Sequence, residues 1–179
     1  MKFDVKENHS VWVEKHPYFQ SLNEKLLEDA TKFDFYTHLQ NTEHTNVRGW
    51  QSNIEENKET PSLKIIRKWV TTLIVENSRK DLFTDHINGS KMWMWFARYE
   101  DGDYTQSHDH ATYASYAFVY FVKAPRGASP LVFTTSGKKI KAEEGKVVIF
   151  PGTLKHHVPN NKCDDRMVIA GSIVFHQSK

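Results

Sequence analysis

The chain has 179 residues, which is enough for one domain with a real hydrophobic core but not comfortably enough for two. Hydrophobic residues make up 39% of the chain and charged residues 26%, a balance that excludes a disordered or membrane-embedded protein. The formal net charge of +2 is too small to indicate a nucleic-acid partner.

The number of cysteines and the first residues of the chain indicate its cellular compartment. The one cysteine, Cys163, excludes an internal disulfide, which favours a reducing compartment. No apolar stretch approaches the roughly eighteen residues of a membrane span. Residues 1–8 also lack the apolar core of a signal peptide. We therefore expect a cytoplasmic protein with no membrane partner, working in the host cytoplasm if a phage encodes it.

The first half of the chain carries helical patterns. From Phe19, apolar residues recur at spacings of three and four, which predicts an amphipathic helix that begins after His16-Pro17. A second helix is predicted from Thr60-Pro61, where an N-cap residue precedes a proline at the first helical position. The apolar stripes of the two helices are Leu22, Leu26, Ala30 and Phe33, and Leu63, Ile66, Val70 and Leu73.

From residue 90 the apolar period changes to two, which is typical of strands. The predicted strands are Lys91 to Tyr99, Tyr113 to Val122, Pro130 to Phe133, Lys146 to Phe150, and Arg166 to Phe175. Asp101-Gly102-Asp103 is a turn signal after the first of them. Helices followed by closely spaced strands indicate an α+β, mainly β protein in which helices pack on one face of an antiparallel sandwich or barrel. We expect a jelly roll in one domain over 1–179, with helical support over 1–89 and the jelly-roll core over 90–179.

Four of the ten histidines fall at two places in the β-rich half. Because residues i and i+2 of an extended segment project to the same side, His108 and His110 can direct two imidazoles at one point. A third imidazole would come from the His156-His157 pair, which follows a strand and a proline-glycine turn; His156 is favoured and His157 is the alternative. Three converging imidazoles predict a metal site, which suits Fe(II) and would also accept zinc, nickel or copper.

Two spaced motifs in this half resemble the cupin motifs. They are Gly102-x5-His108-x-His110, and Gly145-x5-Pro151 followed by His156-x3-Asn160. The glutamate expected after the first motif is missing, and Thr153 stands in place of the usual glycine of the second. The resemblance implies a metal site in a double-stranded β-helix.

A closer resemblance is to a bacterial and phage family of 2-oxoglutarate/Fe(II)-dependent oxygenases. It spans roughly Asn46 to Phe175. The matching pieces are Gly49-Trp50-Gln51-Ser52, Trp95, Gly102-Asp103-Tyr104, His108-x-His110, Val119-Tyr120-Phe121-Val122, Phe150-Pro151 and His156-x-Val158-Pro159-Asn160. The resemblance implies a non-haem dioxygenase that uses Fe(II), 2-oxoglutarate and dioxygen. Its metal ligands would be His108, His110 and His156.

The same resemblance implies residues that bind the cosubstrate. In that family a basic residue about ten positions after the distal histidine binds the far carboxylate of 2-oxoglutarate, and Arg166 stands ten residues after His156. A guanidinium can grip a carboxylate with two parallel hydrogen bonds. Further residues expected on the cosubstrate side are Tyr104, Tyr120 and Ser172. Strand alternation puts Tyr120 on one face with Tyr116 and Phe118, and that face looks either into the barrel or toward the helices.

The chain departs from most 2-oxoglutarate oxygenases at the metal site. They use two histidines and one carboxylate, and here His110 stands where the carboxylate would. A neutral ligand leaves the metal centre one charge more positive, which should weaken metal retention and raise the potential. Ala97 and Ser172 also stand where relatives show asparagine, which puts a substrate amide contact in doubt.

The leading hypothesis is a 2-oxoglutarate- and Fe(II)-dependent dioxygenase that hydroxylates an unidentified substrate. Fold-level analogy makes a protein or peptide side chain the first guess. One alternative is a three-histidine cupin-type metalloenzyme that does not use 2-oxoglutarate. The other is a non-catalytic β-sandwich binding module, in which the histidines lie at the surface and Arg166 pairs with Asp164, Asp165 or Glu143. The aromatic strand around Trp93 and Trp95 would be covered either by the helices or by a second subunit, so a homodimer is one of two alternatives.

Overall fold

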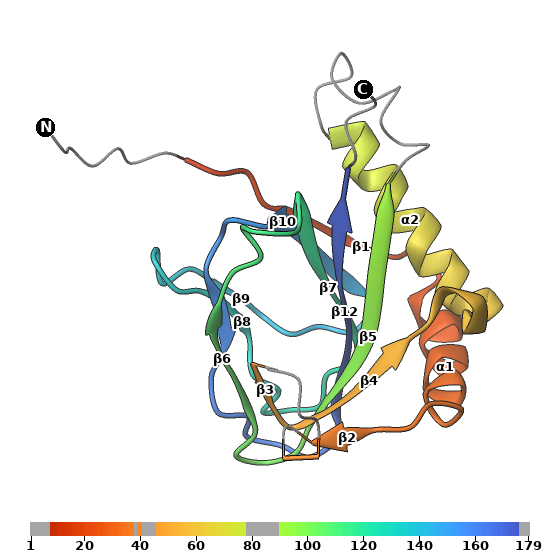
Figure 1. Cartoon of the computed structure of the whole chain (residues 1–179). Helices are drawn as coiled ribbons and strands as arrows, with labels where there is room; N and C mark the ends of the chain where they lie inside the picture. The colour runs from red at the N-terminus through yellow and green to blue at the C-terminus, as the bar shows by residue number, and fades with distance from the viewer. Residues whose placement is uncertain (1–7, 38, 41–45, 78–89, 176–179) are drawn as a thin grey trace, which may run out of the picture.

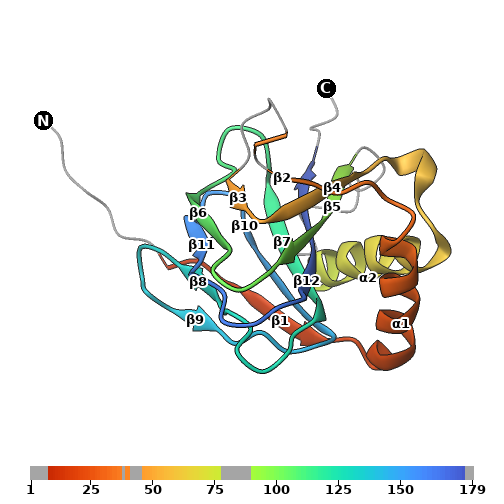
Figure 2. The ribbon, with the colours of Figure 1, turned by 90° about the horizontal axis from the view of Figure 1, so that it is seen from below.

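The computed structural model describes residues 8–37, 39–40, 46–77 and 90–175. The strands of this part of the chain form two antiparallel sheets that face each other, and the two long helices lie beside the larger sheet (Figures 1 and 2). This arrangement confirms the jelly roll with helices on one face.

The larger sheet has seven strands in the order β1-β10-β7-β12-β5-β4-β2. In that order the strands are Trp12–Lys15, Lys146–Pro151, Tyr116–Lys123, Arg166–Val174, Lys91–Tyr99, Trp50–Ile54 and Tyr36–Thr37. The smaller sheet has five strands in the order β3-β6-β11-β8-β9. These are Val47–Arg48, Tyr104–His108, His156–Val158, Leu131–Phe133 and Lys139–Ile140.

The helices begin close to where the sequence predicts. Helix α1 spans Phe19–Ala30 and α2 spans Pro61–Asn77, with a single 3-10 turn η1 at Glu56–Lys58 before α2. The Leu63 N–H donates to Thr60 Oγ1 over 3.3 Å, as expected of an N-cap. Phe33 lies beyond the end of α1 but still packs against the same apolar cluster. The apolar stripes therefore face the sheet as predicted.

Strand β5 shows how the chain builds two cores from one alternating pattern. Met92, Met94 and Phe96 belong to the apolar cluster between the larger sheet and the helices. The alternating residues Ala97 and Tyr99 belong to the cluster between the two sheets. Because side chains alternate across a strand, the larger sheet is buried on both faces at this position. The cluster between the sheets is the one that surrounds the candidate site.

The structure has strands that the sequence-based expectation did not include, β9 among them. The first half was expected to give helical support, but strands β1 to β4, which lie between Trp12 and Ile54, join the two sheets. Within 1–89, residues 1–7, 38, 41–45 and 78–89 lie outside the described part. The predicted strand from Tyr113 begins at Tyr116. Among the described residues, no helix is long and apolar enough to cross a membrane.

Candidate metal centre

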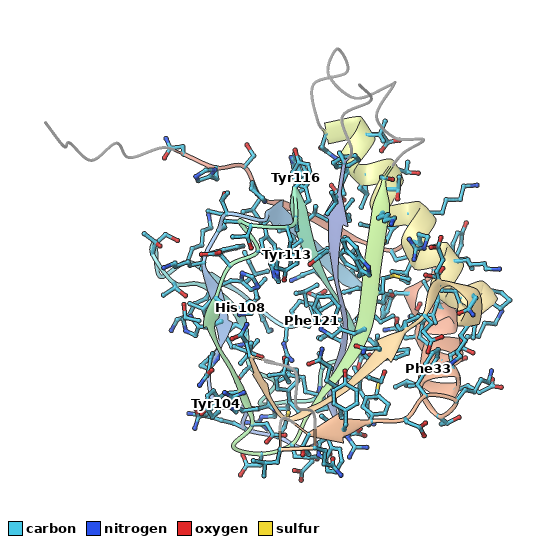
Figure 3. The ribbon with its side chains drawn as sticks, viewed as in Figure 1. Phe33, Tyr104, His108, Tyr113, Tyr116 and Phe121 are labelled. Atoms are coloured by element: carbon cyan, nitrogen blue, oxygen red, sulfur yellow. The ribbon has the colours of Figure 1, made fainter. Side chains whose placement is uncertain are left out.

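Three histidine side chains converge between the two sheets. His108 ends β6 and His156 begins β11, and the two residues are register partners in the smaller sheet. His110 follows β6 in a turn whose backbone is fixed to the β10–β11 turn, because its N–H donates to Gly152 O over 2.7 Å. One ring nitrogen from each of the three histidines lies within 4.8 Å of the others. The ring centroids are 4.3 to 5.2 Å apart. In Figure 3, His108 lies on the smaller sheet, across from Phe121 on the larger one.

The backbone fixes the tautomer of two of these rings. His108 Nδ1 lies 2.8 Å from Gln106 O, and His156 Nδ1 lies 2.9 Å from Leu154 O. A carbonyl oxygen only accepts, so each Nδ1 must carry the hydrogen and donate it. The lone pair is then on Nε2, the nitrogen that the backbone leaves free. Both rings are thus prepared as Nε2 ligands.

The third ring is held by a side chain. His110 Nδ1 makes a short hydrogen bond with the Tyr113 hydroxyl, and the two rings meet edge to face with centroids 5.3 Å apart. Sequence reasoning missed this contact because it placed Tyr113 in a strand. The available signal was the three-residue spacing from His110, which a tight turn brings together.

Burial keeps the three imidazoles neutral. Desolvation is the main cause that lowers the pKa of His110 to about 4 and that of His156 to about 3, and the nearby His108 ring lowers both further. Desolvation also lowers the pKa of His108 itself. A histidine ligates a metal only as neutral imidazole, so the rings are in the ligating form at neutral pH.

The three histidines line one cavity between the sheets together with Arg166. The cavity has about 50 Å³ of open space, and four small residues line it, namely Ala97, Ala117, Ala170 and Gly171. Most of the remaining wall is apolar, and Phe150 packs edge-on against His156 with ring centroids 4.7 Å apart. A mostly apolar cavity with a few converging polar groups is typical of a small-molecule site.

Arg166 opens strand β12 and is fully buried. Its Nε donates to Ser129 O over 3.1 Å, and its guanidinium carbon lies 4.4 Å from the Tyr99 ring centroid. Its two terminal nitrogens have no hydrogen-bond partner of good geometry in the described part of the chain. Burial lowers the pKa of Arg166, but a guanidinium remains protonated in proteins. The Tyr99 hydroxyl also interacts with the guanidinium. A buried cation with no carboxylate partner and no well-aligned partner for its terminal nitrogens is the chemistry of an anion site.

The acidic residues that the sequence offered as partners for this arginine are engaged elsewhere. Asp165 pairs with Lys123, and Asp164 Oδ1 accepts the Asp101 N–H over 3.2 Å. Glu143 pairs with Lys15, with 2.6 Å between Oε1 and Nζ. The hypothesis of an ion pair on a solvated edge is therefore wrong for these three carboxylates.

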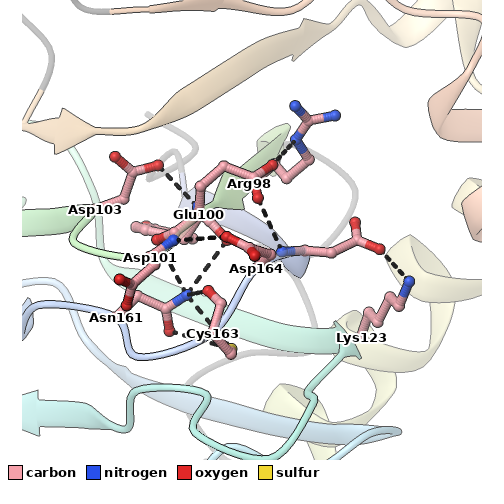
Figure 4. Close-up of polar contacts among 10 residues, drawn as sticks. Arg98, Glu100, Asp101, Asp103, Lys123, Asn161, Cys163 and Asp164 are labelled. Atoms are coloured by element: carbon pink, nitrogen blue, oxygen red, sulfur yellow. Dashed lines mark hydrogen bonds and ion pairs between the residues drawn. The ribbon is translucent and has the colours of Figure 1, made fainter.

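A polar network anchors the loop that leads into β12 (Figure 4). The Asn161 N–H donates to Asp103 O over 2.7 Å, and the Gly102 N–H donates to Asn161 O over 2.9 Å. Asn161 Nδ2 also donates to Cys163 O over 2.6 Å. Gly102 has a φ of 85°, which confirms the predicted turn and explains the glycine there. The network fixes the chain a few residues before Arg166.

Two residues predicted on the cosubstrate side lie elsewhere. Tyr120 is fully buried on the helix side of the larger sheet, where its hydroxyl donates to Asn23 Oδ1 over 2.6 Å. The face that it shares with Tyr116 and Phe118 therefore looks toward the helices. Tyr104 is exposed, and its strand neighbour Thr105 is the residue that lines the cavity. The prediction that Tyr104 and Tyr120 contact a cosubstrate does not fit these positions, because successive strand residues point to opposite sides.

Ser172 is buried near the end of β12 at which Tyr113 lies. It does not line the cavity, although Arg166, Val168 and Ala170 before it on the same strand face do. The prediction of a direct cosubstrate contact for Ser172 therefore has no support in its position. Its neighbour is the tyrosine that holds His110.

The cavity wall also contains a hydroxyl pair that sequence reasoning missed. Tyr99 Oη and Thr105 Oγ1 are 2.7 Å apart, and both residues line the cavity. Strand alternation offered a signal for Tyr99, because it shares a face of β5 with Trp95 and Ala97. Nothing in the sequence singled out Thr105.

Comparison with known proteins supports the fold assignment. No protein-family model matches the sequence, and no curated protein is similar to it in sequence. Among solved structures, a viral collagen prolyl hydroxylase of Paramecium bursaria Chlorella virus-1, in a 2OG complex, is 18% identical with a TM-score of 0.65. That match covers 90% of this chain and 94% of the viral one.

Two further solved structures have the same arrangement. A Pseudomonas putida prolyl-4-hydroxylase is 15% identical with a TM-score of 0.70, over 94% of each chain. A Trichoplax adhaerens prolyl hydroxylase, in complex with a hypoxia inducible factor peptide fragment, is 12% identical with a TM-score of 0.64. That match covers 90% of this chain and 82% of the other. The expectation of a double-stranded β-helix is confirmed.

Proposed function

We propose that the chain is a 2-oxoglutarate- and Fe(II)-dependent dioxygenase. His108, His110 and His156 would hold the iron, and Arg166 would bind the far carboxylate of 2-oxoglutarate. The observation that carries this proposal is one cavity lined by three neutral imidazoles and a buried guanidinium with two unpartnered nitrogens. The likeness in fold to prolyl hydroxylases, one of them in a 2OG complex, supports it.

The residues present fit both groups. Histidine nitrogens bind such metals at about 2.1 Å, so ligands on one face lie roughly 3 Å apart. The three nitrogens lie within 4.8 Å of one another, so metal binding would draw the rings closer together. Three ligands on one face leave the opposite positions open. The unpartnered guanidinium nitrogens fit a carboxylate, because that pair forms two parallel hydrogen bonds.

When bound, Fe(II) and 2-oxoglutarate would supply the oxidation of a substrate C–H bond by dioxygen, with decarboxylation of the cosubstrate to succinate. The chain's own residues position and shield the reactants. Arg166 orients the cosubstrate from the start of β12, held there by Ser129 O and the Tyr99 ring. The apolar wall around His156, with Phe150 against its ring, excludes water from the metal side.

A protein or peptide side chain is the substrate class that we propose. Trp95 lines the cavity, and Trp93, two residues earlier on the same face of β5, has 49% of its surface exposed. Aromatic side chains beside a site suit extended peptide segments. Two solved structures of similar fold support this class, since one is a prolyl-4-hydroxylase and another is in complex with a peptide fragment.

An anaerobic absorption titration tests the proposed function. Adding 2-oxoglutarate to the Fe(II)-loaded protein should produce a visible charge-transfer band, and His108→Ala should lose both the metal and the band. A fully metallated parent without the band would contradict the use of 2-oxoglutarate and favour the three-histidine enzyme that does not need it. A His108→Ala protein that binds iron as well as the parent would favour the non-catalytic module.

A further inference from the structure

The three candidate ligands differ in what holds them. Backbone carbonyls fix His108 and His156, whereas a phenol hydroxyl contacts His110. A carbonyl can only accept a hydrogen bond, but a phenol can donate or accept one. The tautomer of His110 therefore depends on which way the Tyr113 hydroxyl points.

We infer that Tyr113 and Ser172 form a hydrogen-bond relay that sets His110 in its ligating tautomer. In this relay His110 Nδ1–H donates to Tyr113 Oη, and the Tyr113 hydroxyl donates to Ser172 Oγ. If the phenol donated to Nδ1 instead, the hydrogen of the neutral ring would be on Nε2, and that nitrogen could not bind a metal. The inference rests on the proposed function, because it concerns the same metal site.

Ser172 offers the Tyr113 hydroxyl an acceptor. Its side chain is buried and interacts with Tyr113, and its Oγ has no hydrogen bond of good geometry within the described part of the chain. On either side in the sheet its register partners are Trp93 and Ala117. When the phenol oxygen accepts from His110, the phenol hydrogen needs an acceptor of its own, and Ser172 Oγ is a buried oxygen beside it.

The turn after β6 holds Tyr113 in place although 52% of its surface is exposed. Its N–H donates to His110 O over 3.1 Å, and the Ala114 N–H donates to the same oxygen over 2.9 Å. The tyrosine is thus tied to His110 through both backbone and ring. It acts as a positioning residue, and a hydrogen bond to the outer nitrogen also makes the imidazole a stronger ligand. The stronger ligation matters most at His110, because this neutral ligand lacks the charge of a carboxylate.

Zinc affinity measures the relay without turnover. In a competition with a chelating dye, Tyr113→Phe should bind Zn²⁺ about 10–100-fold more weakly than the parent, the usual cost of losing such a partner. Tyr104→Phe is the matched control, because Tyr104 is an exposed tyrosine outside the cavity, and it should stay within about twofold. Ser172→Ala should lose less zinc affinity than Tyr113→Phe. The double variant, Tyr113→Phe with Ser172→Ala, should bind zinc no more weakly than Tyr113→Phe alone, because the two residues act as one unit.

Nitrogen NMR of the metal-free protein, in which no metal dictates the tautomer, supplies a readout that a merely structural role would not change. With ¹⁵N-labelled histidine, the parent should show the Nδ1–H tautomer at all three ligands. Tyr113→Phe should alter the His110 ring alone, with the rings of His108 and His156 unchanged. An unchanged affinity together with an unchanged His110 Nδ1–H signal would overturn the relay.

The outcomes separate the relay from the proposed function. A parent that binds zinc tightly and depends on Tyr113, but shows no charge-transfer band with Fe(II) and 2-oxoglutarate, would keep the relay and contradict the dioxygenase. A parent that shows the band, with Tyr113→Phe equal to it in zinc affinity and NMR spectrum, would keep the dioxygenase and contradict the relay. A parent that binds no metal would overturn both.

Discussion

Removing the buried guanidinium separates a functional role of Arg166 from a structural one. Arg166→Met replaces the cation by an apolar side chain of similar length in a site where two of its nitrogens have no partner. If the role of Arg166 is to bind an anionic ligand, the stability of the ligand-free protein should not depend on it. The metal-loaded variant should nevertheless fail to bind 2-oxoglutarate.

The magnitudes follow from its contacts. Removal loses the hydrogen bond from Nε to Ser129 O, worth about 1.5–3 kcal/mol, and the stacking on Tyr99, worth about 0.5–2 kcal/mol. It relieves an unpaired buried charge that costs about 3–5 kcal/mol. These contributions nearly cancel, so the free energy of unfolding should stay within about 1 kcal/mol of the parent or rise. Losing one partner of a buried charge pair costs about 2–5 kcal/mol of binding, which weakens 2-oxoglutarate about 30- to 5,000-fold.

Two assays check both halves of this prediction. Urea denaturation of the metal-free proteins gives the free energy of unfolding, and calorimetric titration of the metal-loaded proteins gives the 2-oxoglutarate affinity. Arg166→Lys is the matched control. It keeps the positive charge but not the planar guanidinium that forms two parallel hydrogen bonds, so it should weaken 2-oxoglutarate binding without any gain in stability. An Arg166→Met protein destabilised by more than about 3 kcal/mol, or one that binds 2-oxoglutarate within about threefold of the parent, would refute the reasoning.

Three further predictions concern the histidines and the turn that supports them. His156→Ala should abolish stoichiometric metal binding while His157→Ala retains it, measured by metal analysis after dialysis; equal retention would reverse the choice of ligand. Because the pKa values of His110 and His156 are lowered from 6.5 to about 4 and about 3, the unfolded chain binds more protons below pH 6.5. The metal-free protein should therefore lose about 2 kcal/mol per ring between pH 7 and pH 5 in urea denaturation, and a flat profile would contradict their burial as neutral groups. In Gly152→Ala the new Cβ would lie 2.2 Å from Ala114 O, so thermal denaturation should show a loss of about 1–3 kcal/mol, and an unchanged midpoint would contradict the tight packing.

Periodicity predicted the elements that bury a clear apolar face. Strand β5 has the bounds Lys91–Tyr99 that alternation predicts, and α2 begins at the predicted Pro61. Strands β2, β3 and β9 have two residues each and were missed, because such short segments carry no period. Strand β4 was missed because most of its residues are polar. Their place depends on pairing with other strands, which is a property of the whole fold.

At the candidate site, too, local sequence pattern predicted only part of the arrangement of single residues. Spacing predicted which histidines lie together, but it could not predict the carbonyl and phenol contacts that set their tautomers. The alternation of side chains along β7 predicted the residues that share a face with Tyr120. It did not predict whether that face meets the helices or the other sheet. The burial of Arg166 without a partner depends on loops that hold Asp164 and Asp165 elsewhere. These features arise from tertiary packing, and local pattern does not encode them.

The most direct measurement is a crystal structure of the protein grown without oxygen in Mn(II) and 2-oxoglutarate, with anomalous data collected at the manganese edge. We expect one anomalous peak bonded to Nε2 of His108, His110 and His156, with 2-oxoglutarate extending from that peak to the guanidinium of Arg166. A peak outside these three nitrogens, or a 2-oxoglutarate molecule that does not reach Arg166, would contradict the proposed site.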